Sequence, residues 1–298
     1  MSDYESWPQK PHASQWLLFE ENLGKRLSID EVALSRGELY TVITNKAAKG
    51  KKGALVAIIE GTKSEKVIEY LHQIPVAKRK KVEEISLDMA SSMKAIATWA
   101  FPKAVQVTDR FHVQQLCSEA VQELRIRHRW EVIEEENNAI KATKLAGKKY
   151  IEKLLENGDT KRQLLARSRY FLYKSRDKWT DRQKERADIL FGLYPDIEKA
   201  YNLCQNLRAI YNGKYAKEIA MTKLAHWYKE VEDAGFNSFS SIKNTIQLNY
   251  TTILNYFNNR TTNAAAESFN AKIKAFRALF RGVRSATFFL YRLSRIYG

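Results

Sequence analysis

The chain has 298 residues, and 44% of them are hydrophobic, so it can bury at least one sizeable core. Its 50 Lys and Arg outnumber its 34 Asp and Glu, which gives a formal net charge of +16. This excess favours a polyanionic partner such as nucleic acid, because basic side chains neutralise phosphates and release counterions.

The cysteine count and the N-terminal sequence indicate the cellular compartment of the protein. Cys117 and Cys204 are the only cysteines, which excludes a zinc finger and a disulfide framework and favours a reducing compartment. The opening residues MSDYESWPQKPHASQW lack the apolar region of a secretory signal, and no run of about 18 apolar residues predicts a membrane span. We therefore expect a cytoplasmic protein with no membrane association.

Residues 1–26 are mixed in character and are expected to form an irregular N-terminal segment. Three runs rich in Val, Ile, Thr and Tyr follow and predict three strands. Because they succeed one another closely, we expect an antiparallel meander. Their sequences are RLSIDEVAL, ELYTVITN and GALVAIIEG.

The next stretch alternates helices and strands. TKSEKVIEYLHQIP predicts a helix that Thr62 or Ser64 caps and Pro75 ends. EEISLD predicts a fourth strand ending at Asp88, MASSMKAIATWAF a second helix, and AVQVTD a fifth strand ending at Asp109. The order β-β-β-α-β-α-β indicates an α/β fold.

The rest of the chain has helical periodicity and mixed charge, and we expect an all-helical block over roughly 113–260. NAAAESFNAKIKAFRALFRG predicts a helix with two distinct faces. Phe269, Ile273, Phe276 and Phe280 form an apolar stripe, and Asn263, Glu267, Asn270 and Lys274 lie on another face. RSATFFLYRLSRIYG predicts a final short helix.

Three acids stand out in this arrangement. Asp30 lies in the first strand, Asp88 ends the fourth, and Glu267 lies on the polar face of the late helix. Carboxylates brought together repel unless a cation lies between them, and Mg²⁺ prefers carboxylate oxygen. Each acid taken alone has a plainer interpretation: Asp30 as a strand-edge acid, Asp88 as a helix N-cap, and Glu267 as a solvated helix residue.

Three blocks of the sequence resemble the ISL3-type insertion-sequence transposases, which are DDE transposases with an RNase H-like core. They are SIDEVALSRGELYTVITN, SLDMASSMKAIATWAFPKAVQVTDRFHV and NAAAESFNAKIKAF. The resemblance implies a mixed five-stranded sheet and a large all-α insertion before the last catalytic helix. It places the first part of the core at 27–116, the insertion at 117–258, and the C-terminal helices that complete the core at 259–298.

The resemblance also implies the roles of the acids. Asp30, Asp88 and Glu267 look like the catalytic and metal-binding triad, which would hold Mg²⁺, as two ions, with Mn²⁺ able to substitute. Asp109 and His112 look like a secondary D-x-x-H signature. A competing assignment makes Asp109 the second acid of the triad; we favour Asp88 because its strand is expected beside the first. A metal-binding His112 is disfavoured because Mg²⁺ prefers oxygen.

Several residues are candidates for contact with DNA. Trp130 lies among Arg and His in RIRHRWEV and is the best candidate for stacking on a base, although it, Trp179 and Trp227 have core packing as the alternative. The basic run near the C-terminus either follows the DNA backbone or is a solvated helix face. The full candidate set is Arg110, Arg127, Trp130, Asn263, Asn270, Lys272, Lys274, Arg277, Arg281 and Arg284.

The function that the resemblance implies is metal-dependent DNA cleavage and strand transfer at the ends of an insertion sequence, in the bacterial cytoplasm at the nucleoid. A homodimer on DNA is expected because two ends must be paired. Family members usually carry N-terminal zinc-binding and helix-turn-helix segments, and about 26 residues precede the first strand here, so a separate protein is a candidate for end recognition. The alternatives are an RNase H-like nuclease without strand transfer and a catalytically inactive DNA-binding remnant.

Overall fold

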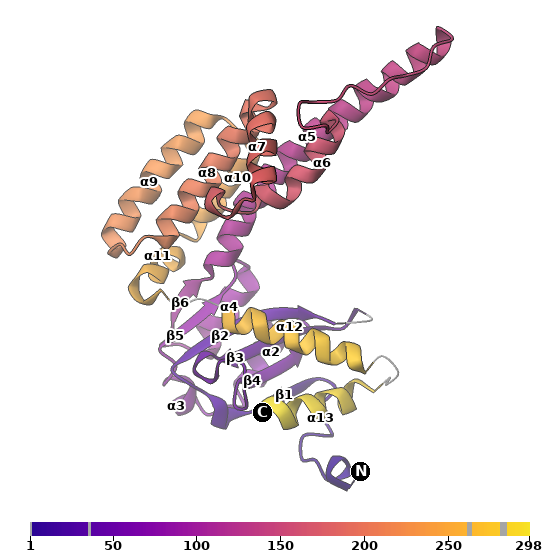
Figure 1. Ribbon diagram of the computed structural model, residues 1–298. Coiled ribbons are helices and arrows are strands. Elements are labelled where there is room, and N and C mark those ends of the chain that lie inside the picture. Colours follow the sequence, from indigo (N-terminus) through magenta and orange to yellow (C-terminus); the bar gives the residue numbers. More distant parts are fainter. Residues whose placement is uncertain (1, 35–36, 261–263, 281–284) are drawn as a thin grey trace. The chain divides into compact units, whose positions relative to one another are not determined.

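A computed structural model describes residues 2–34, 37–260, 264–280 and 285–298 (Figure 1). The chain divides into two compact units. Unit 1 comprises Met1–His112 and Asn249–Gly298, and unit 2 comprises Val113–Leu248. Unit 2 thus runs over 113–248, compared with 117–258 for the insertion expected from the sequence.

Unit 1 is built on a mixed sheet with the strand order β1-β4-β3-β2-β5-β6. Strands β4, β3 and β2 form an antiparallel meander, as predicted, and β2, β5 and β6 pair in parallel. The mixed α/β class is therefore confirmed. The strands are β1 (Trp16–Leu18), β2 (Arg26–Ala33), β3 (Leu39–Asn45), β4 (Leu55–Glu60), β5 (Glu84–Leu87) and β6 (Val105–Thr108).

The sheet has six strands among the described residues, and the prediction of five was wrong. Strand β1 lies in the segment predicted to be irregular and pairs antiparallel with β4, with Trp16 opposite Ile59. Three residues are too few to display a strand period, so its pairing partner determines its conformation. A short helix α1 (Ser2–Glu5) and a 3-10 turn η1 (Glu20–Asn22) flank it.

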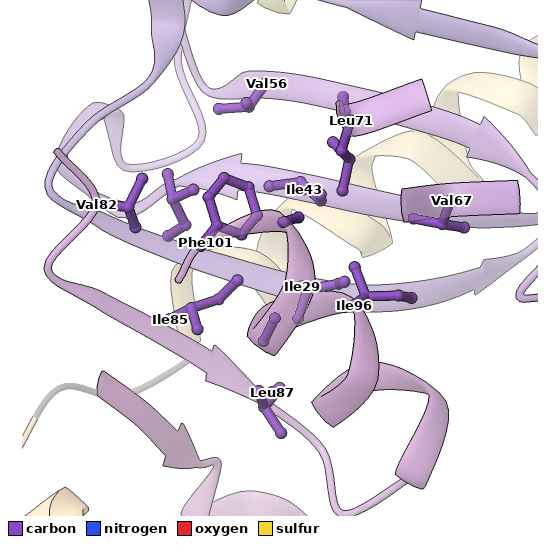
Figure 2. Close-up of a cluster of buried hydrophobic side chains, with 14 of the residues drawn as sticks. Ile29, Ile43, Val56, Val67, Leu71, Val82, Ile85, Leu87, Ile96 and Phe101 are labelled. Atoms are coloured by element: carbon purple, nitrogen blue, oxygen red, sulfur yellow. The ribbon is translucent and has the colours of Figure 1, made fainter. Parts of the chain in front are cut away.

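One face of the sheet is closed by α2 (Ser64–Leu71) and α4 (Ser91–Ala100), and the short helix α3 (Val76–Arg79) lies between them in the chain. Figure 2 shows Ile29, Ile43 and Ile85 from the strands meeting Ile96 and Phe101 from the α4 side. Lys63 is the N-cap residue of α2, without a side-chain cap, so neither Thr62 nor Ser64 occupies the predicted position. Pro75 precedes the separate turn α3, because α2 has already ended at Leu71.

The opposite face is covered by α12 (Ala264–Leu279) and α13 (Ala286–Tyr297). Phe269 and Ile273 of α12 are fully buried in the core against this face, and Phe276 and Phe280 are partly buried beside them. The predicted apolar stripe is thus confirmed as the surface that fixes α12 to the sheet. The helix α11 (Tyr250–Asn259) lies against β6, and the turn η3 (Lys46–Ala48) follows β3.

Unit 2 is all-helical. Trp227 is fully buried and its indole N–H donates to the carbonyl of Leu203 at 2.9 Å, which joins α9 to α8. Thr160 and Thr180 form capping boxes at the starts of α6 and α7. No helix in the described part of the chain is long and apolar enough to span a membrane. The helices are α5 (Arg110–Leu145, which begins at the end of unit 1), α6 (Lys161–Leu172), η4 (Arg176–Lys178), α7 (Asp181–Leu193), α8 (Pro195–Asn212), α9 (Lys217–Ala234) and α10 (Asn237–Leu248).

The burial of Ile273 predicts how strongly α12 depends on its apolar stripe. We expect Ile273→Ala to lower the free energy of unfolding by about 3 kcal/mol, because it leaves a cavity between the helix and the sheet. The thermal midpoint, followed by circular dichroism, should fall by about 5 °C or more. Lys274→Ala, one position along on the exposed face, is the control and should leave the midpoint unchanged. Equal stability of the two variants would contradict the anchoring role.

Candidate active site

Strand register brings three carboxylates to adjacent positions on the sheet. Ser28 of β2 pairs with Ser86 of β5, and Leu87 of β5 pairs with Thr108 of β6. Continuing both registers places Asp88 beside Asp30 and Asp109 beside Asp88. Leu27 and Ile29 point into the core under α2 and α4, so Asp30 points to the opposite face, where α12 lies.

Asp30 is held by α12 as well as by its own strand. Its Oδ2 accepts a hydrogen bond from Nδ2 of Asn270 at 2.6 Å, and its Oδ1 accepts one from the backbone N–H of Glu31 at 2.8 Å. Burial raises the pKa of Asp30, the Glu31 N–H lowers it, and the charges of Asp88 and Asp109 raise it again. The three acids of neighbouring strands therefore lie close enough to repel one another.

Asp88 is half-buried just beyond β5. Its Oδ1 accepts a hydrogen bond from the backbone N–H of Ala90 at 2.8 Å. Ala90 is the N-cap residue of α4, so Asp88 closes the turn that precedes the helix and does not cap it. This bond fixes the direction of the carboxylate and leaves the side chain partly accessible.

Asp109 and Glu267 form a pair of carboxyl groups. Asp109 is only 4% exposed; its Oδ1 accepts the N–H of Phe111 at 3.3 Å, and its Oδ2 has no donor among the described residues. Burial raises the pKa of Glu267, as do the charge of Asp109 and a hydrogen bond to it. His112 lies close enough for its charge to act on Asp30 and Glu267.

Two of the candidates for DNA contact on α12, Arg277 and Asn270, are buried and have partners within unit 1. Arg277 is buried, and its Nε and Nη2 donate to the two carboxylate oxygens of Glu38 at 3.0 and 2.7 Å. The predicted DNA contact of Arg277 stays a prediction, and in this structure Nε and Nη2 of Arg277 serve a bidentate ion pair. The amide of Asn270 is likewise buried and turned to Asp30.

The other candidates for DNA contact have mixed surroundings. Lys272 donates to the carbonyl of Gly50 at 3.1 Å, and Lys274 is exposed. Arg110 donates to the hydroxyl of Tyr256 at 3.1 Å, and Arg127 pairs with Asp196 at 3.2 Å. Asn263, Arg281 and Arg284 lie outside the described residues.

The tryptophans separate into two groups. Trp179 and Trp227 are buried, at 8% and 1% exposed, so the alternative of core packing is correct for both. Trp130 is 63% exposed on α5 and remains a candidate for stacking on a base.

A buried polar cluster beside the acids was missed by sequence reasoning. Nζ of Lys46 contacts Oγ of Ser86 and lies 3.8 Å from Oε1 of Glu84, whose Oε2 accepts Nδ2 of Asn259 at 3.0 Å. Burial lowers the pKa of Lys46, while Glu84 and Asp109 raise it. Glu84 and Ser86 alternate with Ile85 and Leu87, which was a usable signal, but nothing in the Lys-rich loop set Lys46 apart.

The donor set of the site fits a hard divalent cation. Carboxylate oxygens are the ligands that Mg²⁺ prefers, and it needs only one or two of them per ion. The mutual repulsion of Asp30, Asp88 and Asp109, and the buried Oδ2 of Asp109 without a donor among the described residues, are the features that a cation would relieve. Within the described ranges, no three His, Cys, Asp or Glu side chains are already arranged around one ion position.

Comparison with known proteins places the chain in a family. Residues 27–293 match the ISL3 family of DDE transposases, and the chain belongs to that family. It is 23% identical over 264 residues to the transposase for insertion sequence element IS1557 of Mycobacterium tuberculosis, in strains CDC 1551 / Oshkosh and ATCC 25618 / H37Rv. The matched region covers 88% of this chain and 57% of those relatives. No solved structure matches the chain.

The raised pKa of Glu267 predicts that this site destabilises the metal-free protein. When the pKa of an acid is higher in the folded state than in the unfolded state, the free energy of unfolding falls as the pH rises from the unfolded-state pKa through the folded-state pKa. We expect Glu267→Gln to raise the free energy of unfolding at pH 7 in EDTA, by at most about 1 kcal/mol because the group is half-exposed. The amide of glutamine can donate to Asp109, and thermal melting at pH 5 and pH 7 measures the effect.

The difference between Glu267→Gln and the wild type should shrink at pH 5, where a carboxyl with a raised pKa begins to protonate. Glu65→Gln, on the exposed start of α2, is the control. A Glu267→Gln protein that melts below the wild type at pH 7 would show that the carboxylate is a net stabilising group.

Proposed function

We propose that the chain is the catalytic part of a DDE transposase that cleaves DNA at the ends of an insertion sequence and transfers the strand to a target. The observation that carries this proposal is the meeting of Asp30, Asp88 and Asp109 from three neighbouring strands with Glu267 from α12. Family membership supports the same conclusion. Under this proposal, the core of unit 1 is RNase H-like, with β2 and β5 side by side at its centre.

We assign Asp30, Asp88 and Glu267 as the residues that hold two Mg²⁺ ions, with Mn²⁺ able to replace them. When bound, such ions activate water or a 3′-hydroxyl for attack at phosphorus and stabilise the leaving oxygen. The chain's own contribution is orientation. Asn270 fixes one oxygen of Asp30, and the turn at Ala90 fixes Asp88.

Burial supports Asp88 over Asp109 as the second acid of the proposed triad. Asp88 is half-buried, so a DNA phosphate and its ions can approach it, whereas Asp109 is 4% exposed and faces Glu267. Asp109 is therefore assigned as a positioning residue that orients Glu267. His112, one helical turn after Asp109, contributes positive charge near Asp30 and Glu267 when protonated.

The partners follow from the same proposal. DNA is the substrate, and a homodimer on DNA would pair the two element ends. The relatives are longer than the matched region, which covers 57% of them, so recognition of the ends by a region outside the match, or by a separate protein, is part of the proposal.

A plasmid assay tests this function. A supercoiled plasmid carrying the element ends is incubated with the protein and Mg²⁺ or Mn²⁺, and nicked and joined products are separated on gels. We expect the wild type to nick and join, Asp30→Asn and Asp88→Asn to lose both products by at least about 10³-fold, and Asp109→Asn to keep weak activity. Asp188→Asn, in the helical unit, is the control for loss of one carboxylate.

Each other outcome has a definite meaning. Nicked products without joined ones would favour the nuclease alternative. Loss of activity in Asp109→Asn together with retention in Asp88→Asn would make Asp109 the second acid. A wild type that binds DNA but yields no product with either ion, also when supplied with the protein encoded by the neighbouring reading frame, would sink the enzymatic proposal and favour a DNA-binding remnant.

A further inference from the structure

A group of arginines on the helical unit lacks the partners that other arginines of the unit have. Arg125 and Arg129 lie one turn apart on α5, and Arg169 lies on α6. Figure 1 shows α5 and α6 as neighbours, and the contact is fixed by a hydrogen bond of 2.8 Å from Nη1 of Arg125 to the carbonyl of Leu165. Burial lowers the pKa of Arg125, and the charges of the nearby Arg129 and Arg169 lower it further.

Several other arginines of unit 2 form ion pairs with carboxylates. Arg127 pairs with Asp196, Arg162 with Glu136, and Arg167 and Arg186 both with Asp159. Among the described residues, Arg125, Arg129 and Arg169 form no ion pair with a carboxylate. Arg125 is only 6% exposed, so its charge is largely withdrawn from water without a counter-charge, which is unfavourable for folding alone.

The same place has a surplus of hydrogen-bond donors. Gln122 is 6% exposed and accepts Nε of Arg125 at 2.6 Å through its oxygen, while its own Nε2 has no acceptor among the described residues. Nε of Arg129 is likewise buried and lacks an acceptor in the described part of the chain. Buried donors are normally satisfied, so two unsatisfied ones beside three guanidinium groups indicate a missing acceptor with negative charge.

We propose that Arg125, Arg129 and Arg169, with Gln122, form a phosphate-binding site on the helical unit, and that its ligand is a backbone phosphate of DNA. Arg129 and Arg169 are the accessible members and make the contact. Arg125 lies behind them, adds its charge and holds Gln122 in place. The choice of DNA as the nucleic acid rests on the proposed function, whereas the anion site itself rests on the arginines.

The surroundings favour a nucleic-acid phosphate over a free ion. Trp130, adjacent to Arg129, and Tyr170, adjacent to Arg169, are 63% and 68% exposed. Exposed aromatic rings next to a cluster of arginines suit a sugar–phosphate chain, because the rings contact sugars or unpaired bases while guanidinium groups hold the phosphates. A site for inorganic phosphate alone has no use for these rings.

Fluorescence anisotropy with the full chain tests the site. A fluorescein-labelled duplex of random sequence is titrated in EDTA at several NaCl concentrations, so that no cleavage takes place. We expect the double variant Arg129→Gln, Arg169→Gln to bind about tenfold more weakly, and the slope of log affinity against log salt to become shallower by about 1 to 2 units. Arg182→Gln, at an exposed arginine on α7, removes one charge of the same kind outside the site as the control and should change affinity by less than about twofold.

Thermal melting in sodium phosphate and in sodium chloride at equal ionic strength provides the second arm. Phosphate should raise the melting temperature of the wild type and of Arg182→Gln, but not that of the double variant. Circular dichroism of the double variant confirms that it is folded.

Two results would overturn the proposal. If the double variant keeps its DNA affinity and salt slope but loses the response to phosphate, the ligand is a free anion. If it keeps all three, the arginines serve packing alone. The Asp30→Asn variant tests the catalytic proposal separately, because it should lose DNA cleavage and retain DNA affinity. Cleavage therefore tests the catalytic proposal, and DNA affinity tests the phosphate-binding site.

Discussion

The parallel pairing of β5 with β2 on one side and β6 on the other is the constraint on which the site depends. Because side chains alternate with a period of two, the registers that bury Leu27, Ile29 and Ile85 also carry Asp30 and Asp88 to the opposite face. A slip of one residue in β5 would send Asp88 toward the core under α4 and withdraw Leu87 from it. The burial of hydrophobic side chains thus fixes the strand register, and the register in turn fixes the positions of the acids.

Repulsion between Glu267 and the acids of the strands acts to push α12 away from the sheet. Packing must therefore hold the helix in place. Fully burying Phe269 and Ile273 contributes about 1.5–3 kcal/mol each. This packing holds α12 against the sheet although burial and the charge of Asp109 both raise the pKa of Glu267. The ion pair of Arg277 with Glu38 fixes the other end of the helix. Asn270 then orients Asp30 from a helix already held in place by packing.

Local sequence was sufficient where composition or spacing was distinctive. The Val, Ile, Thr and Tyr content of the first three runs predicted β2, β3 and β4, and the spacing of Phe269 and Ile273 predicted the apolar face of α12. Strand β1 escaped prediction because three residues carry no period, and its conformation depends on β4, far away in sequence. The burial of Arg277 was not predictable for a related reason. Its partner in the buried ion pair, Glu38, is distant in the chain. Lys46 shows the same limit, since its partners come from β5.

Charge compensation is the difference between the buried ion pairs of this chain and its two proposed ligand sites. Where a charge is buried for structural reasons, this chain supplies a partner, as Asp159 has Arg167 and Arg186 and Glu38 has Arg277. Among the described residues, Arg79 has backbone carbonyls as its partners instead, and two clusters of like charge depart further from this pattern, with opposite signs. The carboxylates around Asp30 crowd without a cation, and the guanidinium groups around Arg125 crowd without an anion. A protein that holds metal ions and a nucleic acid would leave its charges uncompensated at just these two kinds of place, because the missing counter-charges arrive with the ligands.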